Sequence, residues 1–202
     1  MRALLSGCWD DACVVASSDR RPSRDELLAC AGRTVPPVIA PGLRVLFCGI
    51  NPGLYTAWSG RHFAKPGNRF WPALFRSGFT PRLLGPAEQD ELLQLGLGVT
   101  NVVDRATATA AELTPAELVA GGEALEETAR RYRPAHVAIL GVTAYRAAFH
   151  TPRASLGQQL RRIGPARTWV LPNPSGLNAH VTPATMAAML AELRAAVDEG
   201  PA

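Results

Sequence analysis

Three short loops carry the side chains that are best suited to chemistry, and each loop follows an apolar run. The first loop contains Asn51, the second begins at Asp104, and the third spans residues 173–180. An amide such as Asn51 does not ionise, but its oxygen can orient a water and its nitrogen can donate to a developing anion. Asp104 is the only carboxylate at the end of a predicted core strand, so it is a candidate to meet a positive centre or a water.

Each of these features also has a purely structural interpretation. Asn51 lies in Gly49-Ile50-Asn51-Pro52-Gly53-Leu54, which can be an ordinary turn after a strand. Asp104 can pair with a surface arginine. Leu177 can fold back onto the sheet, or it can be an apolar wedge that unstacks bases. Phe63, in a loop rich in glycine and proline, can anchor that loop on the core or stack on a base.

The sequence lacks the motifs of phosphoryl transfer, of hydride transfer and of catalysis by a serine triad. The sequence has no GxxxxGK[ST] loop, and the glycines at 49–53 lack the spacing of a dinucleotide site. The four histidines are scattered, and no serine sits in a nucleophile elbow. The four cysteines lack CxxC spacing. We therefore expect neither a metal nor a cofactor.

The elements that must position these loops alternate between short apolar strands and amphipathic helices. The predicted strands are 43–48, 97–103, 136–140 and 168–171, and the predicted helices are 86–95, 114–133, 142–149 and 183–198. A further helix is predicted after Asn68, carrying Phe70, Trp71, Leu74 and Phe75 toward the core. This order predicts an α/β fold, a three-layer α/β/α sandwich around a mostly parallel sheet. The three loops leave carboxyl ends of strands, which lie along one edge of such a sheet.

Charge is distributed unevenly along the 202 residues, whose net charge is +4. No Asp or Glu occurs between Glu26 and Glu88 or between Glu127 and Glu192, although both stretches contain arginines. If the two stretches meet on one face, that face suits a polyanion. The alternative is a solvated surface with acids opposite by chance.

We predict a single domain over residues 41–202 and a peripheral extension over residues 1–40. No apolar run approaches the length needed to cross a bilayer, and Asp10 and Asp11 interrupt any signal-peptide core. We therefore expect a cytoplasmic protein without a membrane partner, and we expect a monomer.

Four motifs, in order, carry a resemblance to a known family. They are GINPGL, HFAKPGNRFW, VTNVVDR and LPNPSGL. Over about residues 41–199 the sequence resembles the mismatch-specific uracil-DNA glycosylases, which are related to the thymine-DNA glycosylases within the uracil-DNA glycosylase superfamily. The resemblance implies hydrolysis of the N-glycosidic bond of uracil in double-stranded DNA, notably in a G·U mismatch, and a uracil-DNA glycosylase-like fold.

The resemblance also assigns roles to residues of this sequence. By it, Asn51 orients the attacking water, while Gly49, Ile50, Thr56, His62 and Phe63 surround the flipped base. The wedge and the contact to the opposite base fall on Gly176, Leu177 and Asn178, and the DNA backbone contacts on Lys65, Asn68 and Arg69. The sequence departs from the family at Ala179, where an arginine is common. Arg153, Arg161 or Arg162 are candidates to compensate.

Physical reasoning adds two expectations and leaves two rivals. Asp104 is expected to stabilise a cationic sugar or accept the proton of the water. Lys65 is the only lysine, and a bifunctional glycosylase needs an amine to form a Schiff base, so we expect a monofunctional enzyme that leaves an abasic site. The rivals are a mismatch-sensing DNA-binding module without catalysis, and an enzyme acting on free nucleosides or nucleotides.

Overall fold

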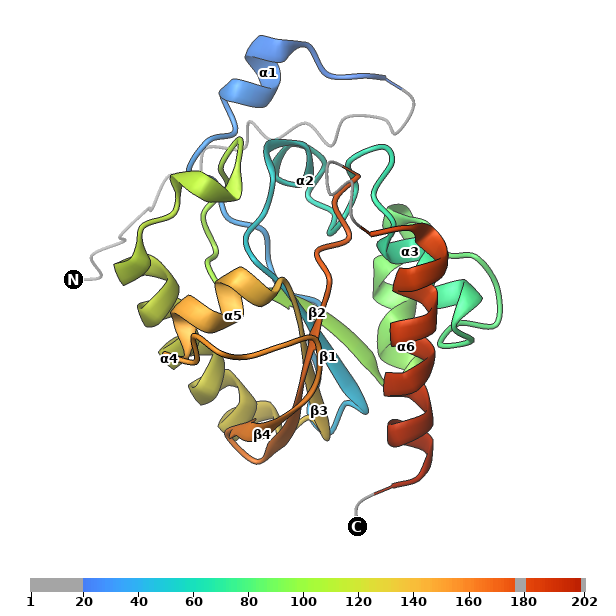
Figure 1. Ribbon diagram of the computed structural model, residues 1–202. Helices are drawn as coiled ribbons and strands as arrows, with labels where there is room; N and C mark the ends of the chain where they lie inside the picture. Colours follow the sequence, from blue (N-terminus) through green and yellow to red (C-terminus); the bar gives the residue numbers. More distant parts are fainter. Residues whose placement is uncertain (1–19, 177–180, 201–202) are drawn as a thin grey trace, which may run out of the picture.

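The computed structural model describes residues 20–176 and 181–200, which form a five-stranded sheet (Figure 1). Its strands are β1 (Val45–Gly49), β2 (Leu97–Asn101), β3 (His136–Leu140), β4 (Gly157–Ile163) and β5 (Ala166–Leu171). Their order is β2-β1-β3-β5-β4, and only β4, at one edge, pairs antiparallel. The predicted α/β fold with a mostly parallel sheet is therefore confirmed.

Helices cover both faces of the sheet and make the outer layers of the sandwich (Figure 1). Helices α3 (Phe70–Arg76) and α6 (Pro183–Asp198) pack on the face that receives Val45 and Phe47 of β1. Helices α4 (Pro115–Tyr132) and α5 (Val142–Ala148) pack on the opposite face, which receives Leu46 and Cys48. Because side chains alternate along a strand, a strand buried on both faces needs a continuous apolar run, as β1 has.

The remaining elements are shorter. They are α1 (Arg24–Leu28), α2 (Leu54–Ser59) and the 3-10 helices η1 (Pro86–Leu95) and η2 (Ala110–Glu112). The predicted helix at 86–95 is thus a 3-10 helix with a kink at Glu88. Phe75 differs from its prediction, because its side chain is 43% exposed and does not reach the core. None of the described helices is both long and apolar enough to cross a membrane.

Residues 30–39 form a segment that we call the N-terminal strap, and it lies against the end of the sheet. Val38 exchanges backbone hydrogen bonds of 2.9 and 2.8 Å with Val99 of β2. The Gly32 amide donates to the Ala106 carbonyl at 2.9 Å, and the Ala106 amide donates to the Arg33 carbonyl at 2.8 Å. Val38 is also part of the core. The described part of the predicted extension therefore packs on the domain beside the loop that follows β2.

The three loops singled out from the sequence all follow carboxyl ends of neighbouring or near-neighbouring strands. Asn51 follows β1, Asp104 follows β2, and residues 172–176 follow β5. Backbone hydrogen bonds hold the first two loops side by side, because the Val103 amide donates to the Ile50 carbonyl at 3.0 Å. In Figure 1 the chain after β5 runs toward α2 and α3 at the same end of the sheet. The fold thus brings the candidate loops to one edge.

Candidate active site

The side chain of Asn51 is held by its nitrogen. Nδ2 donates to the Arg105 carbonyl at 3.0 Å, to the Thr107 hydroxyl at 2.7 Å and to the Pro52 carbonyl at 3.2 Å. A carbonyl can only accept a hydrogen bond, so these partners fix which end of the amide is the nitrogen. Oδ1 has no hydrogen-bond partner within residues 20–176 and 181–200. The oxygen is therefore placed to accept a hydrogen bond from a water.

A second group of contacts keeps the acceptors of Asn51 in place. The Thr107 hydroxyl donates to the Thr109 carbonyl at 2.8 Å, so its oxygen must accept from Asn51. The Arg105 guanidinium forms an ion pair with Glu117 and donates to the Glu112 carbonyl at 3.1 Å. Arg105 lowers the pKa of the Glu117 carboxyl to about 2, so the carboxylate is ionised at neutral pH. The loop after β2 is thus a rigid support for Asn51.

Gly49 opens a narrow space at the end of β1. A Cβ atom on Gly49 would lie 2.5 Å from Oδ1 of Asn101 and 3.4 Å from the ring of Phe63. Asn101 has 9% of its surface exposed. Its side chain makes no hydrogen bond to any described residue, and its amide still reaches solvent. Glycine is required here for close approach. The space between an aromatic ring and a buried amide has the features of a site for a flat polar ring.

Phe63 anchors its loop on the core, and its stacking on a base stays a prediction. Its ring packs on Phe70 at a centroid distance of 4.1 Å, and two atoms of its edge face the Gly49 position. Its φ of +54° is rare for a bulky residue, and such conformations cost on the order of 1–3 kcal/mol. The packing on Phe70 thus anchors the ring in an unfavourable backbone conformation beside the space left by Gly49.

His62 is placed differently from its neighbour. Its side chain is 1% exposed, and Nε2 lies 3.0 Å from the Pro36 carbonyl of the N-terminal strap. Burial lowers its pKa, with a smaller opposing effect from the bond to Pro36. Its carbonyl accepts from the indole of Trp71 at 3.2 Å. These contacts tie the 60–63 loop to the strap, and a contact of His62 with substrate stays a prediction.

The residues predicted to contact the DNA backbone line a groove of about 320 Å³ with the stem of the third loop. Its lining includes Lys65, Asn68 and Arg69 from one loop and Ser175 and Gly176 from the other. The Asn68 side chain also accepts from the Phe70 amide at 2.9 Å. The N-cap of α3 is Arg69, so the cap that we predicted at Asn68 was placed one residue too early. Contact of these side chains with DNA stays a prediction.

Four other residues were predicted to belong to the site. Leu177 and Asn178 lie outside the described residues. Thr56 is buried on α2, with 7% of its surface exposed. Asp104 is exposed, and it makes no ion pair or hydrogen bond within the described ranges. It lines a cavity of about 410 Å³ together with Asn101 and residues of the N-terminal strap, so it is available to a ligand at the end of β2.

The site includes residues that we did not single out from the sequence. Asn101 lies in the VTNVVDR motif, where its sequence predicts part of a strand. Thr107 lies just after the motif, where the sequence predicts a loop. A buried asparagine at the end of a strand is a signal that could have marked Asn101, because buried polar side chains need partners. Nothing in the sequence marks Arg105 and Glu117 as a pair, since they belong to different elements.

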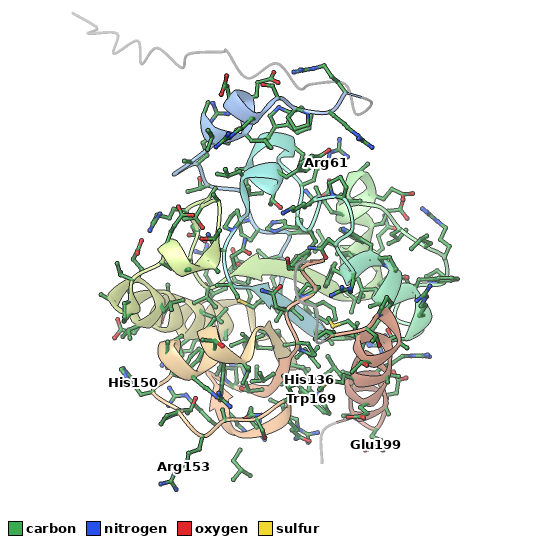
Figure 2. All side chains as sticks on the ribbon, turned by 45° about the horizontal axis from the view of Figure 1, so that its top comes forward. Arg61, His136, His150, Arg153, Trp169 and Glu199 are labelled. Atoms are coloured by element: carbon green, nitrogen blue, oxygen red, sulfur yellow. The ribbon has the colours of Figure 1, made fainter. Side chains whose placement is uncertain are left out.

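The structure places basic residues of the two acid-free stretches in different parts of the molecule. Arg61 lies at the top of Figure 2 and Arg153 at the lower edge. Several of the other arginines are paired with acids, among them Arg44 with Asp198 and Arg161 with Glu126. The loop before α3 carries three basic residues, Arg61, Lys65 and Arg69.

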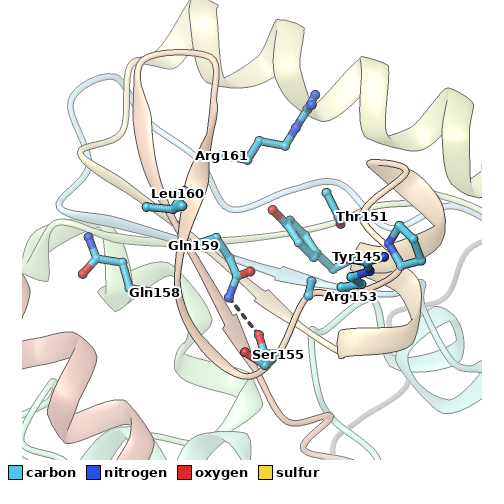
Figure 3. Close-up of a pocket in the computed structure, with 10 residues that line it drawn as sticks. Tyr145, Thr151, Arg153, Ser155, Gln158, Gln159, Leu160 and Arg161 are labelled. Atoms are coloured by element: carbon cyan, nitrogen blue, oxygen red, sulfur yellow. Dashed lines mark hydrogen bonds between the residues drawn. The ribbon is translucent and has the colours of Figure 1, made fainter.

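A larger cavity lies elsewhere. It measures about 560 Å³ and is lined by Tyr145 of α5, by residues 151–155 of the loop after α5, and by residues 158–161 of β4 (Figure 3). Of the residues considered from the sequence, only Arg153 and Arg161, the candidates to compensate for Ala179, line it. We place the candidate site at the Asn51 loop instead, because Asn51 is held there in one orientation and Asn101 and the Phe63 ring meet beside Gly49, two residues earlier. No group of three or more His, Cys, Asp or Glu in the described ranges is arranged to hold a metal ion.

The architecture and the site define an α/β/α enzyme with a polar pocket at the carboxyl edge of a parallel sheet. Comparison with protein families agrees with this class. The uracil DNA glycosylase superfamily model matches residues 36–194, which is most of the chain. The protein therefore belongs to the uracil-DNA glycosylase superfamily, whose members are DNA N-glycosylases, hydrolases of DNA repair that act on uracil.

Proposed function

We propose that the protein removes uracil from mismatched double-stranded DNA by hydrolysis and leaves an abasic site. The observation that carries the proposal is the orientation of Asn51, whose nitrogen is bound by Arg105, Thr107 and Pro52 while its oxygen is open to a water. A base in a duplex is shielded, so the nucleotide must be extruded, and this costs less for a mismatched pair. A G·U pair is accordingly the proposed substrate.

In the proposed reaction the water held by Asn51 attacks C1′ of the deoxyribose. A C–O bond forms as the bond between C1′ and N1 of uracil breaks, and the electron pair leaves with the uracil as an anion. The water loses its proton, which Asp104 or the solvent accepts. Main-chain donors near Ile50 support the departing anion.

The base would occupy the space beside Gly49. The ring of Phe63 offers a stacking surface, and the Asn101 amide offers one donor group and one acceptor, which match the alternating polar edge of uracil. The Asn101 amide supports this role because it makes no hydrogen bond to a described residue and still reaches solvent, so its donor and acceptor are open to a ligand.

The proposal is tested with single-turnover excision from labelled G·U, G·T and A·U duplexes and from single-stranded uracil DNA, followed by alkaline cleavage. Excision that is fastest from G·U is the expected result. Binding of G·U DNA without excision would favour the mismatch-sensing module, and release of bases from free nucleosides would favour the nucleoside enzyme.

A separate proposal concerns the DNA strand, which the protein would leave uncut at the abasic site. Lys65 is the only lysine, and it is exposed in the groove beside Ser175 and Gly176. We propose that the protein acts without a Schiff base and that the abasic product stays intact. A covalent enzyme–DNA adduct trapped by borohydride during excision would contradict this.

A further inference from the structure

Arg69 donates hydrogen bonds to three consecutive residues at the stem of the third loop. Its backbone amide donates to the Pro174 carbonyl at 2.9 Å. Its guanidinium donates to the Ser175 carbonyl at 3.0 Å and to the Gly176 carbonyl at 3.4 Å. The next residue in the sequence is Leu177, so these bonds end where the predicted wedge begins.

The two loops also touch through their backbones. A Cβ atom on Gly176 would lie 2.9 Å from the carbonyl oxygen of Gly67, so no larger residue fits without a shift. On the stem itself, the Asn173 side chain accepts from the Ser175 amide at 2.9 Å. Prolines at 172 and 174 restrict the backbone further. The stem is thus a stiff segment fixed to the 67–69 turn.

The same turn is joined to the stacking platform. The Asn68 side chain accepts from the Phe70 amide, and the Phe70 ring packs on Phe63 at 4.1 Å. The turn therefore connects the ring that would receive the base with the stem that leads to the wedge.

We propose that Arg69 is a positioning residue for the wedge. It holds residues 174–176 so that Leu177 enters the base stack while the extruded uracil reaches Phe63. The two carbonyl oxygens bound by its guanidinium give Arg69 this role in addition to its predicted contact with a DNA phosphate. The inference rests on the proposed excision of uracil from duplex DNA and deepens it.

The role predicts a defect in extrusion rather than in chemistry. Single-turnover excision is measured for wild type, Arg69→Ala and Arg69→Lys on two duplexes, one with a G·U pair and one with uracil opposite an abasic-site analogue. The second duplex has no pair to break. Arg69→Ala is expected to slow excision from G·U by about tenfold or more and from the second duplex by less than about threefold. Arg69→Lys should fall between, since a lysine can bind one carbonyl but lacks the guanidinium fork.

Arg194→Ala is the matched control. Arg194 lies on α6, donates to the Ser77 carbonyl at 3.5 Å and is also half-exposed, so the substitution removes the same charge and the same type of contact elsewhere. It should leave the ratio of the two rates unchanged. Equal slowing of Arg69→Ala on both duplexes would overturn the proposal. A second result would also overturn it. In that result the DNA binding of Arg69→Ala depends less steeply on salt than that of wild type, by about one phosphate contact, while the ratio of the two excision rates is unchanged.

Hydrogen exchange in the DNA-free proteins gives a readout that does not depend on excision. Peptides that include residues 172–176 should exchange faster in Arg69→Ala than in wild type or Arg194→Ala. Unchanged exchange there would overturn the positioning role. If wild type excises nothing from either duplex, the proposed function fails, while the exchange measurement still decides whether Arg69 holds the stem.

Discussion

The side-chain nitrogen of Asn51 donates a 3.0 Å hydrogen bond to the carbonyl oxygen of Arg105, a residue 54 positions further along the chain. This bond fixes the orientation of the amide, so that its oxygen points away from this partner and is open to a water. The end of β1 supplies the amide, and the loop after β2 decides how the amide is oriented.

Removing or inverting the Asn51 amide tests this orientation. Asn51→Ala should lower single-turnover excision by about a hundredfold or more, because the water loses its positioned acceptor. Asn51→Asp places an oxygen opposite the carbonyls of Pro52 and Arg105, which disfavours the charged form.

The pKa of the introduced carboxyl should therefore rise above about 3.9, its value in the unfolded chain. A raised pKa in the folded state means that the cost of Asn51→Asp grows as pH rises from about 4 toward neutrality. This cost is measured by comparing the melting temperatures of wild type and Asn51→Asp from about pH 4 to neutral pH. A gap in melting temperature that is constant with pH, or full activity of Asn51→Ala with DNA binding intact, would contradict the assigned orientation.

Gly49→Ala should block the space for the base without unfolding the protein. The φ of Gly49 is not in the left-handed region, but the added Cβ would lie 2.5 Å from Oδ1 of Asn101. Uracil excision should fall by about tenfold or more, because the added methyl group occupies the space proposed for the base. The overpacking should also lower the free energy of unfolding by about 1–3 kcal/mol. The double variant Gly49→Ala with Asn101→Ala should recover stability, since the colliding atom is gone, but not activity. Measured melting temperatures and rates of the single and double variants form the test. Unchanged excision by Gly49→Ala would place the base elsewhere.

The edge of the sheet that carries the site was predictable, because carboxyl ends of parallel strands lie together. The partners of Asn51 were not. Thr107 and Arg105 contact it only through the pairing of loops from different strands, which local sequence does not encode. Strand β4 was also missed, because its sequence GQQLRRI is mostly polar, and an exposed edge strand needs no continuous apolar run. Arg69 was predicted to contact the DNA backbone, and the carbonyls that it binds became apparent only in the structure.

Glu117→Gln tests the support behind Asn51. The bond with Arg105 is the largest cause of the lowered Glu117 pKa, about 2, followed by bonds with Thr114. A lowered folded pKa gives stability that is present above about pH 4.5 and lost as pH falls toward 2. Glu117 therefore stays ionised between pH 5 and 9, and the contribution of the ion pair to activity should not change with pH in that range. Glu117→Gln should slow excision several-fold at every pH in that range.

The control for that variant is Glu127→Gln, on the same helix. Glu127 is 74% exposed and pairs with Arg130, outside the site, so its rate should match wild type. If Glu117→Gln also matches wild type, the ion pair contributes nothing to the placement of Asn51.

His62 should make folding sensitive to mild acid. Burial lowers its pKa below the ordinary 6.5, so the unfolded chain binds a proton that the folded chain refuses. Stability due to neutral His62 is therefore present above about pH 6.5 and declines as pH falls toward the lowered folded value. His62→Gln should flatten the fall in melting temperature between pH 7 and 5.

His136 also has a pKa lowered by burial, so part of the pH dependence should remain in His62→Gln and be removed by the same change at His136. If His62 contacts substrate, His62→Gln should also slow excision at pH 7.5, where its protonation does not matter. An identical pH dependence of wild type and His62→Gln would exclude His62 as a source of acid sensitivity.

The long interval between Asn51 and the residues that bind it also bears on how the protein acquires activity during folding. Neither β1 nor the helix after it can orient the amide, so a nascent chain has no working site until residues beyond Thr107 have emerged and β2 has aligned beside β1. Contacts between distant residues form slowly because loop closure comes first. Catalytic competence is thus a late product of folding, and recovery of excision during refolding reports on strand alignment more directly than recovery of helical signal does.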